Sequence, residues 1–158
     1  MSVKTSPERP RYIILGFQTN KSGDQTTNPS LFDHCRLTNA YIMLNQDRYP
    51  IIDYICDFRN AKVSRIYNDS ATFSQKFYGM NELLTLSGIS PNEFIDLYPI
   101  FVFDVSNQSE RLKESVMNIQ IKCAFDDNVP ANTQAYAVVI SDRFINLQSD
   151  ENRMSVVF

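Results

Sequence analysis

The chain has 158 residues, a length that suits one globular domain and leaves little room for two. Only 21% of the residues are charged and the net charge is −3, which excludes a protein that binds nucleic acid through a basic surface. With four glycines in the whole chain, a glycine-rich phosphate loop and a dinucleotide fingerprint are also excluded. No window holds the roughly 18 continuous apolar residues of a membrane helix, and the polar N-terminus lacks a signal-peptide core. We therefore expect an intracellular chain with no membrane insertion and no specific nucleic-acid partner.

Short β-branched and aromatic runs separated by polar loops dominate the first third of the chain. Residues 12–18 predict a strand, and the polar run 19–29 that follows predicts a surface loop. A second strand is predicted over 36–45. An extended run resumes at 49–52, where Pro50 indicates a strand edge or a strand start.

The strand within 36–45 is apolar on both faces. One face carries Leu37, Tyr41 and Met43, and the other carries Ala40, Ile42 and Leu44. Such a strand fits a sheet that is covered on both sides, or a sheet with one face in contact with another chain.

The segment 63–78 has a different period. Its stripe of Ile66, Ser70, Phe73 and Phe77 recurs at spacings of four, three and four, which predicts a helix that ends at Gly79.

A second helix is predicted to start at Ser90. The run Ser90-Pro91-Asn92-Glu93 places serine at the N-cap, proline at the first helical position and glutamate at the third, which is a capping box. Pro99 should end this helix after about two turns.

The last third returns to strand patterns, with a one-residue offset at Met117 that suggests a β-bulge. The predicted strands are 100–105, 116–125, 134–140 and two short closing strands at 144–147 and 155–158. Loops rather than regular crossover helices separate the strands. The sequence therefore predicts an all-β protein, an antiparallel β-sandwich with one or two short helices in its loops.

The candidates for chemistry are few. The three cysteines, Cys35, Cys56 and Cys123, are scattered and form no CxxC pair, which argues against a disulfide framework and a zinc site. The only histidine, His34, precedes Cys35 directly. Neighbours on an extended segment point to opposite faces, so the two should not form a nucleophilic dyad, and His34 would have to meet one of the other thiols.

The carboxylates point to no catalytic or metal site either. Asp126-Asp127-Asn128 offers oxygen ligands but lacks the spacing of a calcium loop, so a polar turn is the better interpretation. We predict no catalytic, metal or cofactor-binding residues. Six tyrosines could instead lie at interfaces, although core packing explains each of them equally well. They are Tyr41, Tyr49, Tyr54, Tyr67, Tyr78 and Tyr98.

Several runs, taken in order, resemble the double jelly-roll major capsid proteins of Polinton/Maverick elements and adintoviruses. The first of these runs are Lys4-Thr-Ser, Pro10 to Thr19, Gln25 to Cys35 and Leu37-Thr-Asn39. The later ones are Tyr49-Pro50, Phe77-Tyr-Gly79, Tyr98 to Ser106, Val129 to Thr133 and Ala135 to Arg143. The chain resembles the C-terminal of the two jelly rolls, with its first strand missing or clipped. Residues 1–10 would be a lead-in and 11–158 a single, incomplete jelly-roll domain.

This resemblance implies a viral structural protein that is not an enzyme and needs no cofactor. It would form contacts in the capsomer and the virion shell, with itself or with other capsid subunits, and three chains would build one capsomer. The strand at 37–44 and the surface tyrosines are candidates for these contacts. The alternative is a domesticated host protein that uses the β-sandwich as a protein- or ligand-binding module, and such a protein would be intracellular.

Overall fold

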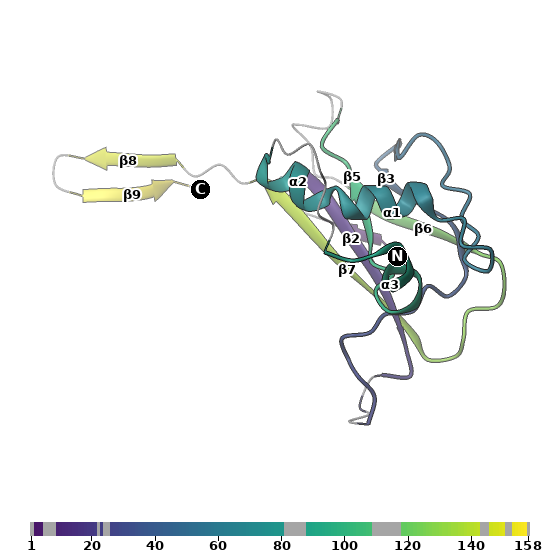
Figure 1. The fold of residues 1–158 in the computed structure, drawn as a ribbon. Coiled ribbons are helices and arrows are strands. Elements are labelled where there is room, and N and C mark those ends of the chain that lie inside the picture. The colour runs from purple at the N-terminus through teal and green to yellow at the C-terminus, as the bar shows by residue number, and fades with distance from the viewer. Residues whose placement is uncertain are drawn as a thin grey trace.

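Two antiparallel sheets form the body of the protein (Figure 1). The computed structural model describes residues 2–4, 9–21, 23, 26–80, 88–108, 118–142, 146–150 and 153–157. The four-stranded sheet has the order β1-β6-β3-β4, and the three-stranded sheet has the order β5-β2-β7. The bounds are β1 Ser2–Lys4, β2 Arg9–Thr19, β3 Leu37–Leu44, β4 Asp47–Tyr49, β5 Phe101–Asp104, β6 Asn118–Phe125 and β7 Thr133–Asp142.

The strand pairing is nested. β1 pairs with β6, β2 with β5 and β3 with β4, so the chain runs outward from the innermost β3–β4 hairpin in matched pairs. Cross-pairing of β3 with β6 and of β2 with β7 completes the two sheets. This wrapped, paired order is that of a jelly roll, and it confirms the predicted antiparallel sandwich.

A single apolar core lies between the two sheets. Alternate residues of each strand face inward, as the two-residue period of a strand requires. The three-stranded sheet contributes Ile13, Leu15, Phe17, Phe101 and Phe103, and the four-stranded sheet contributes Leu37, Ala40, Ile42, Leu44, Ile119 and Ile121. The rings of Phe17 and Phe125 meet edge to face at 5.5 Å across this core.

Three short helices cover the outer face of the three-stranded sheet, namely α1 Ser64–Ala71, α2 Phe73–Tyr78 and α3 Pro91–Asp96 (Figure 1). Tyr12 of β2 contacts the rings of Phe73 and Phe77 of α2 edge to face, at 5.1 and 6.0 Å. No helix in the described part of the chain is long and apolar enough to cross a membrane.

The helix predictions are confirmed, with two changes. The segment 63–78 is helical but breaks at Thr72, whose hydroxyl donates to the carbonyl of Asn68. Gly79 follows with φ +65°, the left-handed conformation that favours glycine at a helix end. The capping box at Ser90 is present in full, and α3 ends at Asp96, somewhat earlier than predicted.

The prediction that the extended run 49–52 continues as a strand is wrong. β4 ends at Tyr49, and Ile51 and Ile52 lie in an irregular segment. The reason lies at the edge of β3, where the amide of Cys56 donates to the carbonyl of Thr38 at 2.7 Å. Residues further along the chain thus occupy the place that a longer β4 would need.

Both ends of the chain contain strands. Within the lead-in expected over 1–10, Ser2–Lys4 forms β1 and pairs with β6, and β2 already starts at Arg9. The closing strands pair with each other as β8 Asn146–Asp150 and β9 Arg153–Val157, a hairpin drawn apart from the two sheets (Figure 1). The β-bulge predicted at Met117 lies outside the described residues, and so do Phe144 and Phe158 of the predicted closing strands.

Register shifts occur at Pro10/Tyr12 in the pairing of β2 with β7 and at Leu37/Asn39 in the pairing of β3 with β6.

Candidate functional site

The segment 50–56 displays three isoleucines to solvent. Ile51 is 84% exposed, Ile52 63% and Ile55 80%. Scattered single apolar residues on a surface are ordinary, but three within five residues form a concentrated apolar patch of the kind found at interaction sites. We call residues 51–55 the isoleucine loop.

Buried anchors on either side of Ile55 hold the loop to the body. Tyr54 and Cys56 are both buried in the core. The hydroxyl of Tyr54 donates to the Asp69 carboxylate of α1 at 2.8 Å, and the Tyr54 amide donates to the side-chain oxygen of Asn39 at 3.3 Å. Burial, followed by the negative charge of Asp69, raises the pKa of Tyr54 far above its usual range, so its hydroxyl stays a donor.

A polar network on the same loop fixes Asp53. The Asp53 carboxylate accepts from the side chain of Asn39 and from the guanidinium of Arg48. The Asn39 and Arg48 hydrogen bonds hold the pKa of Asp53 below its ordinary value. The Arg48 guanidinium also lies 4.0 Å from the centroid of the Tyr41 ring. The loop is therefore tied to β3 and β4 through its polar residues, while its isoleucines contact solvent.

The backbone at Ile55 is strained. Its φ is +51°, in the left-handed region that β-branched residues rarely adopt. This conformation costs an L-residue about 1–2 kcal/mol. An exposed, β-branched residue held at this backbone cost is a functional candidate, since strain of this kind concentrates at functional sites.

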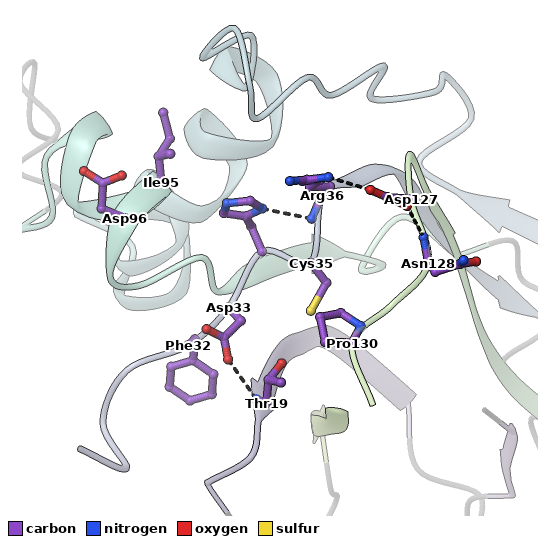
Figure 2. A pocket seen from close by; sticks show the side chains of 11 residues that line it. Thr19, Phe32, Asp33, Cys35, Arg36, Ile95, Asp96, Asp127, Asn128 and Pro130 are labelled. Atoms are coloured by element: carbon purple, nitrogen blue, oxygen red, sulfur yellow. Dashed lines mark hydrogen bonds and ion pairs between the residues drawn. The ribbon is translucent and has the colours of Figure 1, made fainter. Parts of the chain in front are cut away.

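The second candidate is an open cleft of about 580 Å³ around His34, Cys35 and Arg36 (Figure 2). It lies where the loop after β2 meets the β6–β7 turn and the end of α3. Figure 2 shows the Cys35 sulfur pointing toward Thr19 and Pro130. The cleft is lined by both polar and apolar side chains, and His34 and Cys35 are its potential nucleophilic groups.

His34 and Cys35 do not form a dyad, as the sequence predicted. The Nδ1 of His34 accepts from the amide of Arg36 at 2.9 Å, and the ring stacks on Phe58 at 4.5 Å. Burial and the nearby Arg36 lower the pKa of His34, so the ring is neutral near pH 7. Burial raises the pKa of Cys35, which keeps it a protonated thiol and a weak nucleophile.

Ion pairs join the cleft to the neighbouring loops. Arg36 pairs with Asp127 at 2.6 Å, and Arg59 pairs with Asp126 at 3.1 Å. The predicted polar turn at 126–128 thus connects the start of β3 with the 57–62 turn. Among the described residues, no three His, Cys, Asp or Glu side chains gather as a group that could hold a metal ion.

The six predicted interface tyrosines lie in different environments. Tyr54 is buried and belongs to the core, which is the core-packing alternative. Tyr78 is exposed at the end of α2. The other four are half-buried: Tyr41, Tyr49, Tyr67 and Tyr98. In the strand at 37–44, Ala40, Ile42 and Leu44 face the core, while Tyr41 and Met43 lie half-buried on the outer face.

The family model of the double jelly roll-like domain matches residues 1–145, which is most of the chain. The chain belongs to the double jelly roll-like domain family. No curated protein and no solved structure matches it significantly. Membership of this family agrees with the nested strand order and with the jelly-roll resemblance. The double jelly roll-like domain accordingly gives the chain a fold of the viral capsid type.

Sequence reasoning missed the isoleucine loop. The run Ile51-Ile52 has the β-branched composition of a strand, and composition alone does not show that Cys56 takes the free edge of β3. One signal was present in the sequence: Pro50 limits the length of a strand that starts before it.

Proposed function

We propose that this double jelly roll-like domain is a structural subunit of a shell, comparable to the C-terminal jelly roll of the Polinton and adintovirus capsid proteins. The observation that carries the proposal is the isoleucine loop: a rigid, strained, apolar segment on a capsid-type fold. Buried apolar anchors surrounded by polar residues are the usual centre of a protein–protein interface. In this proposal the loop contacts the neighbouring subunit in a capsomer of three chains, and the protein resides in the virion.

The loop is suited to this role for two reasons. The Asp53 carboxylate already accepts hydrogen bonds from Arg48 and Asn39 inside the subunit, which lowers the cost of covering it. Its backbone is anchored on both sides of Ile55 by the buried Tyr54 and Cys56, so little backbone entropy is lost there when a partner binds.

The test uses Ile55→Asn, because its two effects have opposite signs. Asparagine adopts a left-handed backbone more readily than isoleucine, so the free energy of unfolding should rise by about 1 kcal/mol. Loss of the apolar side chain should raise the concentration needed for assemblies larger than a dimer by about tenfold or more. Urea unfolding measures the first effect, and light scattering with electron microscopy measures the second.

Ala61→Asn is the matched control, since Ala61 is exposed and also has a positive φ of +54°. It should stabilise the fold and leave assembly unchanged. If the wild-type chain remained free of larger assemblies at high concentration, or if both variants assembled equally well, the shell role would be contradicted. The domesticated binding module would then be the better interpretation.

A further inference from the structure

We propose that β7 pairs edge to edge with β7 of a second copy of this chain, in an antiparallel arrangement about a two-fold axis. The starting observation is the nested pairing. β1 is matched with β6, β2 with β5 and β3 with β4, and β7 lies outside these three nested pairs. Within the described part of the chain β7 pairs with β2 alone, so its other edge has no partner there.

The open edge of β7 differs from the other three sheet edges. β1 and β4 have three residues each and β5 has four, whereas β7 has ten. Proteins protect exposed edges by keeping them short or by placing charges, prolines or bulges on them. β7 carries none of these over residues 133–141, whose sequence is TQAYAVVIS. This edge is therefore the one that lacks protection against pairing.

The side chains of β7 show that both of its faces are incompletely covered. On the outer face Tyr136 is 47% exposed and Val138 is 57% exposed, opposite Gly16 and Ile14 of β2. On the inner face Ala137 and Val139 pack against the core but remain half-buried. An added strand would bury apolar groups on both sides of the sheet.

A second copy fits this edge because the strand is self-complementary. A two-fold axis through Ala137 places Tyr136 opposite Val138 of the second copy, twice, on the same outer face. Thr133 then lies opposite Ser141, so the polar ends meet each other. Residues 133–141 include no charged side chain, so this pairing brings no like charges together. The exposed apolar pair of each copy is covered by that of the other, which is the residue exchange of an isologous interface.

This inference is independent of the shell role, and Val138→Lys tests it. The wild-type chain should form a dimer in sedimentation and light scattering. Val138→Lys should weaken this dimer by about tenfold or more, because it removes the apolar contact of Val138 and places a charge on the pairing edge. Val138 is exposed in the single chain, so the variant should fold, which thermal unfolding checks.

Val129→Lys provides the matched control, since Val129 is also exposed but lies in the β6–β7 turn. It should leave the dimer unchanged. Ala137→Cys tests the register: under oxidation it should form a covalent dimer at a higher yield than the parent chain, which has cysteines elsewhere.

A monomer at all concentrations would overturn the pairing and leave the edge to a strand of another protein. Equal weakening by Val138→Lys and Val129→Lys would also overturn it. The isoleucine-loop variant Ile55→Asn should keep the dimer and lose only the larger assemblies, so failure of either proposal is recognised separately.

Discussion

Gly16 occupies a position on β2 where a side chain does not fit. A Cβ atom built there would lie 2.7 Å from Cδ1 of the Phe32 ring. Phe32 is in turn held by its amide, which donates to the carbonyl of Leu97 at 3.0 Å. The loop after β2 therefore lies directly on the sheet at this glycine. The sequence shows only a glycine within a strand pattern, and the residue that approaches it cannot be read from spacing.

Gly16→Ala should lower the free energy of unfolding by about 1–3 kcal/mol, because the added methyl group overpacks a buried site. Urea denaturation measures this loss. Phe32→Ala removes the neighbouring ring, so Gly16→Ala should cost much less in that background. Equal costs in the two backgrounds would show that the ring is not the cause.

At the scale of the element, signals between residues close in sequence predict the structure correctly, whereas the ends of strands depend on contacts between distant residues. The capping box of α3 was predictable because all of its groups lie within four residues. The Ser90 hydroxyl accepts from the amide of Glu93 at 3.3 Å, and the Glu93 carboxylate accepts from the amide of Ser90 at 2.8 Å. Pro50 indicates that β4 is short, but the hydrogen bond from the amide of Cys56 to the carbonyl of Thr38 cannot be predicted from the sequence.

Ser90→Ala should lower stability by about 1 kcal/mol, the usual cost of losing an N-cap side chain. Ser74→Ala is the control, since Ser74 is an exposed serine inside α2 and alanine is the better helix former there. Chemical denaturation measures the free energy of unfolding of both variants. A loss as large in Ser74→Ala as in Ser90→Ala would contradict the capping explanation.

At the scale of the whole molecule, the fold class was predictable and the pairing was not. Alternation of apolar and polar residues predicts strands and a sandwich, but it says nothing about which strands are neighbours. The nested order, the open edge of β7 and the shared core arise from contacts between distant segments. Cys56 and Cys123 show this: they are far apart in sequence, and both pack into the same core.

The two thiols should make the free energy of unfolding of the whole fold sensitive to pH in the alkaline range. Burial raises the pKa of Cys56 and of Cys123 from 9.0 to about 11. Because the folded pKa exceeds the unfolded value, their stabilising contribution is complete below pH 9 and is lost as the pH rises toward 11. The free energy of unfolding should therefore fall across this range.

The variant for this prediction is Cys56→Ala combined with Cys123→Ala. Its stability should decline less steeply between pH 9 and 10, whatever its stability at pH 7. Denaturant titrations at several pH values measure the slope. An unchanged slope would indicate that the thiols titrate alike in the folded and unfolded chain.

The pairing of β2 with β7 also determines when this protein can fold. Gly16 lies opposite Tyr136, so the central strand of the three-stranded sheet pairs with a strand that is synthesised much later than itself. The β3–β4 hairpin, by contrast, joins neighbouring segments and can form early. Because pairings between distant segments slow folding, we expect β2 to leave the ribosome long before its sheet closes. During that interval we expect the apolar run Tyr12 to Phe17 to be unpaired and prone to aggregation.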